Sequence, residues 1–398
     1  AEVHDDHRRW ALRHAEAVTR YTPAMSFIYL DYNATTPIDP RVAKVMHDLL
    51  RDHYGNPSSG HRAGREAKKE LERARGQIAR CLGCRSDEVV LTSGGSEANN
   101  LAIRGLVEAC GGGHVITSAI EHPAVLEVVL ALEGTGAIEL SVVGVDQRGR
   151  VDPMEVEREL REDTVLVSLM LANNEVGTLQ PLAEVASLCR SRAVALHTDA
   201  AQAVGKVQVN IRDLGVDLLT VAGHKLYAPK GVGALFVRDG LELVPQIRGA
   251  GHELGRRAGT ESVLLASGLG RACEIAAHEV TKEGTRLAGL RDRLAEALRR
   301  GHPDLVVHGD PDNRLANTLS VALPGIDANS ALDSIGDELA ASTGAACHAG
   351  TTTVSHVLEA MGVEAGLAAS TMRLSVGRFT TEEEIDRAAE LILGATSA

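Results

Sequence analysis

The chain has 398 residues, enough for two domains and a large buried core. Its hydrophobic content of 44% and charged content of 24% are those of an ordinary soluble globular protein. The formal net charge of -13 and the aromatic content of 2% disfavour a nucleic-acid-binding protein, which needs basic patches and stacking platforms. All uninterrupted apolar runs are short, so we expect no transmembrane helix and no membrane partner.

Residues 1–26 carry charges of both signs and lack the apolar core of a signal peptide. A polar helix could span Asp5 to Thr19, and we interpret the segment as an N-terminal extension that is flexible or not native. The six cysteines have no framework spacing, so a secreted disulfide scaffold is disfavoured and a cytoplasmic location is the default. Cys81 and Cys84 form a lone CxxC without further ligands at zinc spacing, and no metal site is expected.

From residue 27 onward, short apolar strands and amphipathic helices alternate, which indicates an α/β domain with a mostly parallel sheet. Ligands of such sheets bind at the carboxyl ends of the strands, where the loops are placed. The predicted strands are Phe27–Asp31, Glu88–Thr92, His114–Ser118, Ile138–Val143, Thr164–Met170, Ala193–Thr198, Leu218–Ala222 and Ala234–Arg238. The predicted helices are Arg41–His53, Arg62–Leu82, Glu97–Ala109, Pro123–Leu132, Pro153–Arg161 and Leu182–Arg192.

A long helix is predicted from Ser262 to about Arg300, and it leads to a smaller C-terminal unit. We expect a large domain over residues 38–262, and a small α+β domain made of residues 27–37 and 263–398. The predicted elements of the small domain are strands near Leu305–His308 and Ala316–Ala322, helices Ser330–Glu338, Val354–Met361 and Thr381–Leu393, and a loop at Ser342–Thr353.

The stretch from His197 to Gly231 carries the most chemistry. Asp199 ends one apolar run, and a second run delivers Lys225 into a loop rich in Gly and Pro. A desolvated lysine amine forms Schiff bases with carbonyl compounds. Pyridoxal phosphate (PLP) requires such an amine for its aldehyde and a carboxylate that keeps its pyridine nitrogen protonated. Either residue alone would suit a turn cap or an exposed lysine, but the pair favours a PLP site.

Several loops after strands carry groups that could complete such a site. Gly95 and Ser96 open a helix in TSGGSEANN, where backbone N–H groups and the helix dipole favour one phosphate. The pattern is neither GxGxxG nor a nucleoside-triphosphate loop, and a plain glycine turn would also explain it. His122 could stack on a ring and move protons. Asn174 and Gln202 could hydrogen-bond a ring substituent, although Asn and Gln in loops are commonly turn formers.

The C-terminal unit contributes a thiol and two guanidinium groups. Cys347 lies among small residues in ASTGAACHAG with His348 beside it, a setting that gives a thiol access and a neighbouring base. Arg373 and Arg378 follow one helix later, and an arginine there suits bidentate capture of a carboxylate. A small loop filler and solvated arginines are the alternative interpretations.

Taken together, these motifs resemble the cysteine desulfurase and selenocysteine lyase family, whose members are homodimeric fold-type-I PLP enzymes related to class V aminotransferases. The resemblance runs from about Phe27 to Leu393 in the correct order. The motifs are LDYNATTP (Leu30–Pro37), GNPSS (Gly55–Ser59), TSGGSEANN (Thr92–Asn100), EHPAV (Glu121–Val125), ANNEVG (Ala172–Gly177), HTDAAQAVGK (His197–Lys206), GHKLYAPKGVG (Gly223–Gly233), RRAGT (Arg256–Thr260), GAACHAG (Gly344–Gly350) and RLSVGRFTTEEEID (Arg373–Asp386).

The resemblance implies a role for each matching residue. Lys225 would hold PLP, Asp199 would pair with the pyridine nitrogen, and Cys347 would be the sulfur-accepting nucleophile. The ring and its phenolic oxygen would contact His122, Asn174 and Gln202. The phosphate would be held by Gly95, Ser96 and His224, with Thr260 contributed by the other subunit of a homodimer. The substrate carboxylate would be bound by Asn33 and Arg373, with Asn174 nearby.

The implied reaction converts L-cysteine to L-alanine and leaves a persulfide on Cys347 for an acceptor protein of unknown identity. The nearest alternative is selenocysteine lyase, which would release selenium from L-selenocysteine, and a remote one is a non-catalytic binding partner of the same fold. Two departures bear on the choice. Ala222 stands where many desulfurases have a phosphate-binding serine, and the chain stops soon after Leu393, without the tail that iron–sulfur scaffolds grip.

Overall fold

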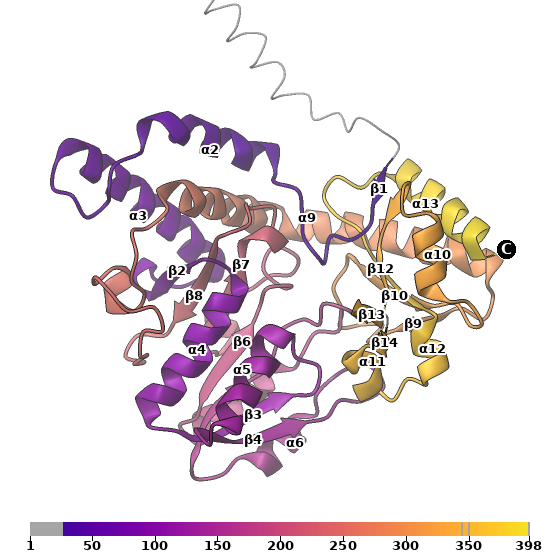
Figure 1. Cartoon of the computed structure of the whole chain (residues 1–398), viewed down its shortest axis with the longest axis horizontal. Coiled ribbons are helices and arrows are strands. Elements are labelled where there is room, and N and C mark those ends of the chain that lie inside the picture. The colour runs from indigo at the N-terminus through magenta and orange to yellow at the C-terminus, as the bar shows by residue number, and fades with distance from the viewer. Residues whose placement is uncertain (1–26, 344, 349–350, 397–398) are drawn as a thin grey trace, which may run out of the picture.

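The computed structural model describes residues 27–343, 345–348 and 351–396, so the predicted extension at residues 1–26 lies outside the described residues. Its central element is a seven-stranded sheet in the order β2-β8-β7-β6-β5-β3-β4 (Figure 1). Only β8 runs antiparallel to its neighbours, which confirms the predicted α/β fold. The strands are β2 (Val89–Thr92), β3 (Gly113–Ser118), β4 (Ile138–Val143), β5 (Thr164–Ser168), β6 (Ala195–Asp199), β7 (Leu218–Ala222) and β8 (Gly233–Val237).

Helices cover both faces of this sheet, so β2, β6, β7 and β8 are buried at every residue. One face packs on α4 (Gly95–Cys110) and α5 (Pro123–Gly134). The other face packs on α3 (Arg62–Leu82), α6 (Pro153–Glu159), α7 (Leu182–Ser191) and the first part of α9 (Val263–Gly301). Two shorter helices, α2 (Pro40–Asp52) and α8 (Ile211–Leu214), complete this part of the chain. None of the helices in the described ranges is long and apolar enough to cross a membrane.

The C-terminal part forms a four-stranded antiparallel sheet in the order β12-β15-β10-β9. Helix α9 extends from the large sheet to this smaller unit and packs there on α13 (Figure 1). Strand β1 (Ile28–Tyr29) pairs with β11 (Leu339–Ala340), so the start of the described chain lies beside its C-terminal part. The domain boundaries remain a prediction. The other elements are β9 (Val306–His308), β10 (Thr318–Ala322), α10 (Ala328–Ser334), β12 (Ser342–Thr343), α11 (His356–Ala360), α12 (Ala365–Ala369), β15 (Thr371–Ser375) and α13 (Glu382–Thr396).

The prediction of a loop at Ser342–Thr353 is wrong, because most of this segment forms strands. Strands β13 (Ala345–His348) and β14 (Thr351–Val354) pair as an antiparallel hairpin that places Cys347 opposite Thr352. Three consecutive β-branched threonines favour an extended strand, and the small residues around Cys347 hid that preference. The predicted nucleophile is therefore carried on a hairpin arm.

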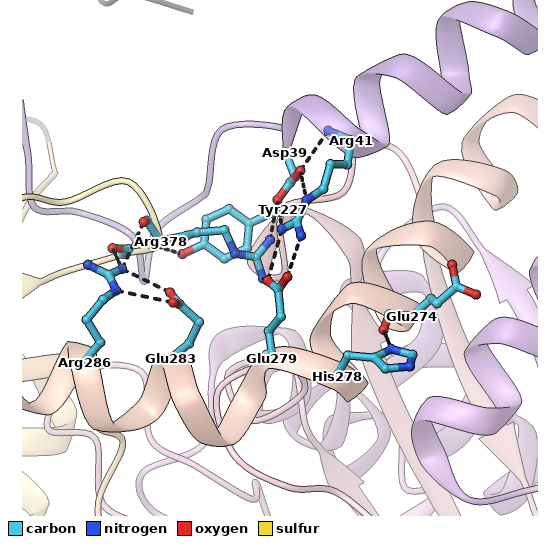
Figure 2. A network of polar contacts seen from close by, with 10 residues as sticks. Asp39, Arg41, Tyr227, Glu274, His278, Glu279, Glu283, Arg286 and Arg378 are labelled. Atoms are coloured by element: carbon cyan, nitrogen blue, oxygen red, sulfur yellow. Dashed lines mark hydrogen bonds and ion pairs between the residues drawn. The ribbon is translucent and has the colours of Figure 1, made fainter.

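A polar network joins the segment after β15 to the large domain (Figure 2). The Arg378 guanidinium donates to Asp39 Oδ2 at 2.6 Å and lies 4.4 Å from the ring centroid of Tyr227. The backbone N–H of Arg378 donates to the Tyr227 hydroxyl at 2.7 Å. Arg286 of α9 donates to the carbonyl oxygens of residues 377, 378 and 380. Because Tyr227 is two residues from Lys225, the network braces the loop that carries the predicted Schiff-base lysine.

Candidate active site

A cavity of about 290 Å³ lies where the parallel strands of the large sheet end. Asp199 is the last residue of β6, and Lys225 follows β7 by three residues. Since the carboxyl ends of these strands share one edge of the sheet, their loops converge on one space. The lining residues are Ala34, Gly95, Ser96, Asn99, His122, Ala124, Met170, Ala172, Asn174, Asp199, Ala201, Gln202, Ala222, His224 and Lys225.

The cavity thus brings together eight of the predicted site residues. These are Gly95, Ser96, His122, Asn174, Asp199, Gln202, His224 and Lys225. A larger hollow of about 900 Å³ lies at the opposite edge of the sheet, where β5 and β6 begin. That hollow holds none of the predicted site residues, so the smaller cavity is the candidate active site.

The Asp199 carboxylate is buried and fixed in position. Its Oδ2 accepts a hydrogen bond from Asn99 Nδ2 at 2.8 Å, and its Oδ1 accepts one from the Ala201 N–H at 2.9 Å. Asn99 is completely buried in α4, and its own Oδ1 has no hydrogen-bond partner among the described residues. Two donors of this kind hold the carboxylate in one orientation at the cavity floor.

The Lys225 amine points into the same cavity and donates to the main-chain oxygen of Asn33 at 2.5 Å. Burial and, after it, the positive charge of Arg373 lower its pKa to about 8, although Asp199 and Asp31 act in the opposite direction. A lysine with this pKa is partly unprotonated near neutral pH. It can therefore act as a nucleophile or as a base, which an ordinary surface lysine cannot.

Two imidazole groups lie beside this amine. His122 caps the N-terminus of α5 through Nδ1, which accepts from the Ala124 N–H at 3.0 Å, and its ring is exposed at the cavity. Desolvation lowers the pKa of His122, the Lys225 amine lowers it further, and Asp199 opposes both. Burial and the neighbouring Lys225 amine lower the pKa of His224 to about 4, and its Nδ1 lies 3.2 Å from Thr35 Oγ1. Both rings are therefore neutral at pH 7.

The start of α4 supplies an anion cradle. Gly95 and Ser96 are the first residues of this helix, so their N–H groups have no partner within it. A Cβ atom on Gly95 would lie only 3.2 Å from the Cβ of Ala222, which shows how closely the backbone approaches the cavity wall. The arrangement suits one phosphate group.

The predicted carboxylate-binding residues lie behind this cavity and are already engaged. Asn33 is completely buried, and its Nδ2 donates to the Asn174 carbonyl at 3.0 Å and to Thr318 Oγ1 at 2.8 Å. Arg373 donates to Asp31 Oδ1 at 2.8 Å and to the Asn174 carbonyl at 3.3 Å. Its buried Nε has no partner among the described residues, so the guanidinium retains one free donor.

Cys347 and Thr260 are the remaining two predicted site residues. Cys347 is placed by its backbone alone, and its side chain lies outside the description. The hairpin that carries it ends beside the cavity, because Ser355 Oγ donates to Glu175 Oε2 at 2.5 Å, next to Asn174. Thr260 is exposed on the surface ahead of α9, so its predicted contact with a second subunit remains a prediction.

Sequence reasoning missed two buried polar residues of the site. Asn99 lies four residues after Gly95, on the same helix face, and this spacing could have revealed it. Glu121 is completely buried beside His122, although charged residues are rarely buried, so no sequence signal pointed to it. Its Oε1 accepts from Ser118 Oγ at 2.7 Å and from the Met170 N–H at 2.8 Å.

A lysine and an aspartate facing one cavity at the carboxyl edge of a mostly parallel sheet are the arrangement of PLP-dependent transferases. The model of the family "Aminotransferase class-V" matches residues 28–388. The chain therefore belongs to the class V aminotransferase family.

Comparison with individual proteins narrows the group. The cysteine desulfurase IscS of Dictyoglomus turgidum is 43% identical over 364 residues, which cover 90% of this chain and 92% of that protein. The cysteine desulfurase of Mus musculus is 40% identical over 394 residues, covering 97% of this chain and 84% of that protein. A solved NifS-like protein has a TM-score of 0.88 and 36% identity, with 93% of this chain and 99% of that chain covered. Fold type I, as predicted, is thereby confirmed.

Proposed function

We propose that this protein is a PLP-dependent cysteine desulfurase that converts L-cysteine to L-alanine and transfers sulfur to Cys347. The observation that carries the proposal is that the Lys225 amine and the Asp199 carboxylate line one cavity beside the His122 ring. Relatives named cysteine desulfurase over 90% or more of the chain support the same activity. A solved relative described as SspA in complex with cysteine, with a TM-score of 0.78 and 34% identity, supports the substrate.

The residues of the cavity fit PLP. Lys225 would hold its aldehyde carbon, Asp199 its pyridine nitrogen, and the cradle at Gly95 and Ser96 its phosphate. His224 would assist at the phosphate, and Asn174 and Gln202 at the ring's phenolic oxygen. When bound, PLP supplies a protonated ring that accepts the electron pair of a bond broken at the substrate.

The residues of the chain perform the remaining steps. Lys225, with its lowered pKa, takes the proton from the substrate Cα. The Cys347 thiolate forms a bond to the substrate sulfur while the substrate Cβ–S bond breaks. The electron pair of that bond remains with the carbon skeleton. The skeleton takes up one proton at Cβ and regains one at Cα, which Lys225 returns, and leaves as L-alanine. Neutral His122 is placed to accept the proton of the substrate thiol.

Arg373 is proposed to bind the substrate carboxylate. Its buried, unpartnered Nε supports this role, because a carboxylate would satisfy the orphaned donor. Asn33 would contribute to the same pocket by holding the carbonyl of Asn174, which Arg373 also contacts. We also propose a homodimer in which Thr260 of one subunit reaches the phosphate bound by the other, and a separate protein that accepts the persulfide sulfur.

The test measures L-alanine formation from L-cysteine by the PLP-loaded protein with a reductant present. Lys225→Ala, Asp199→Ala and Cys347→Ala should each lower the rate at least about a hundredfold. Lys230→Ala is the matched control, because this exposed lysine lies in the same loop and should leave the rate unchanged. Full activity in Lys225→Ala would overturn the proposal.

Selenocysteine lyase remains the second candidate because Ala222 lines the cavity where the resemblance leads us to expect a serine in many desulfurases. The same assay with L-selenocysteine separates the two. A desulfurase loses its L-cysteine activity in Cys347→Ala while the L-selenocysteine activity persists. Negligible turnover of L-cysteine by the unaltered protein would instead select the lyase.

A further inference from the structure

A second lysine amine lies within the polar network beneath the cavity. Lys206 follows the turn after β6, and its Nζ donates to Asn33 Oδ1 at 2.8 Å and to Gln202 Oε1. The residue is half-buried, and no carboxylate forms an ion pair with it in the described ranges. Burial of the amine lowers the pKa of Lys206 well below its usual value, and the Lys225 and Arg373 charges add to this effect. Lysine amines are rarely buried without a countercharge, so the position of Lys206 needs a structural or functional explanation.

Its two acceptors are amide side chains: Gln202 lines the cavity, and Asn33 lies behind it. Gln202 is 5% exposed, so each end of its amide needs a partner. Its Nε2 donates to the Asn33 main-chain oxygen at 2.8 Å, and its Oε1 accepts from Lys206. With the oxygen and one N–H held in this way, the second N–H of Gln202 is left for whatever occupies the cavity that Gln202 lines.

Asn33 is held by the same amine. Its Oδ1 accepts from Lys206 at 2.8 Å and from Asn317 Nδ2 at 3.0 Å. Its main-chain oxygen accepts from both Gln202 and Lys225. Lys206 therefore steadies two groups that contact each other, one of which is the hydrogen-bond acceptor of the Lys225 amine.

Removing the amine would leave the Gln202 oxygen buried without a donor. An unsatisfied buried acceptor is destabilising, and Gln202 can relieve this by turning its oxygen toward the cavity. An oxygen in that position would face the phenolic oxygen of a bound PLP ring, where a donor is needed. Removal of the Lys206 amine would therefore weaken the binding of PLP.

We propose that Lys206 is a positioning residue for the cofactor, which it serves by fixing the Gln202 amide so that an N–H faces the phenolic oxygen of PLP. The proposal rests on the proposed function, because it assumes that PLP occupies this cavity. It adds a residue outside the cavity lining to those that determine how the ring is held.

A double-mutant cycle on the binding of PLP to the apoprotein tests the proposal. Lys206→Met should weaken PLP binding about tenfold, equivalent to about 1.4 kcal/mol, and change the visible absorption spectrum of the bound cofactor. Gln202→Met should weaken binding by at least as much, and the double variant should bind no more weakly than Gln202→Met alone. Lys206→Arg, which keeps a donor, should restore much of the affinity. The control Lys282→Met removes an exposed lysine of α9 and should bind like the unaltered protein.

Each result decides the matter. Unchanged affinity in Lys206→Met, or losses that multiply in the double variant, would overturn the proposal while the proposed function stands. Thermal unfolding of the apoproteins separates positioning from stability. If Lys206→Met fails to fold, or if its apoprotein is destabilised as much as its binding is weakened, Lys206 is a structural residue and the proposal falls. An unaltered protein that binds no PLP through Lys225 would overturn the proposed function as well.

Discussion

Replacement of Glu121 by Gln gives a quantitative test of whether the buried carboxyl group beside the active site is protonated in the folded protein. The Glu121 carboxyl is completely buried, and its Oε2 has no hydrogen-bond partner among the described residues. Burial is the main cause that raises its pKa from 4.5 to about 8; the Asp199 charge acts in the same direction, and hydrogen bonds from Ser118 and Met170 oppose both. Glu121 is therefore mainly protonated at pH 7 in the folded protein and ionised in the unfolded chain.

The sign of the pH dependence follows from this difference. A carboxyl whose pKa is higher in the folded state binds its proton more tightly there, so unfolding free energy is lost as pH rises from about 4.5 to about 8. Each pH unit in that interval costs about 1.4 kcal/mol. Glu121→Gln keeps an oxygen for the two donors and removes the ionisation. The variant should therefore gain about 2–3 kcal/mol relative to the unaltered protein between about pH 6 and pH 8.

Urea unfolding of both apoproteins at a fixed protein concentration measures this gain, because ionisable groups common to the two cancel in the difference. Glu127→Gln is the matched control, since Glu127 is exposed on the adjacent helix α5. The difference in unfolding free energy between Glu127→Gln and the unaltered protein should not change with pH. If the difference in unfolding free energy between Glu121→Gln and the unaltered protein is also independent of pH, the argument that the buried carboxyl is protonated is refuted.

Three further predictions follow from the same structure. The rate at which the apoprotein forms its Schiff base with PLP should rise with pH, with a midpoint at about pH 8 in stopped-flow measurements. Asp199→Asn should move this midpoint lower, because the carboxylate raises the pKa of Lys225. A midpoint above pH 10 would contradict this. Arg378→Met leaves the buried Asp39 carboxylate without one partner and should cost about 2 kcal/mol of unfolding free energy in urea. An unaltered urea midpoint would show that the network is dispensable. Ala222→Ser adds a hydroxyl beside the first amides of α4 and should tighten PLP binding about fivefold by equilibrium dialysis, whereas weaker binding would show that the wall has no room.

The sequence was sufficient to predict the large sheet because its strands are short segments rich in apolar and β-branched residues, separated by helical patterns. Strands β4 and β7 lie where the patterns predicted them, to the residue. The site residues at the carboxyl edge of the sheet were found for the same reason. Once the end of a strand is predicted, as for β6 at Asp199, the residues at that end and in the loop after it are the candidates for the site. Local pattern and tertiary position coincide there.

The remaining features depend on contacts between distant segments. The hairpin at Cys347 needs β13 to find β14, and glycine and alanine carry little strand preference of their own. Strand β1 is two residues long and exists only because β11 lies beside it. The burial of Glu121 and the inward turn of Lys206 are opposite to what their residue types predict. Only the folded structure supplies the partners that make these positions acceptable.

Asn33 shows how closely the two parts of the molecule depend on each other at the site. Its main-chain N–H donates to Ser375 Oγ at 2.9 Å in the smaller sheet, while its main-chain oxygen accepts from Lys225 in the large domain. Its amide contacts Thr318 and Asn174, one on each side of the junction. A substitution at Asn33 would therefore disturb the amine, the cavity wall and the junction together. An effect on substrate affinity in such a variant could not be assigned to carboxylate binding, whereas Arg373, with one free donor, is the position where that role can be isolated.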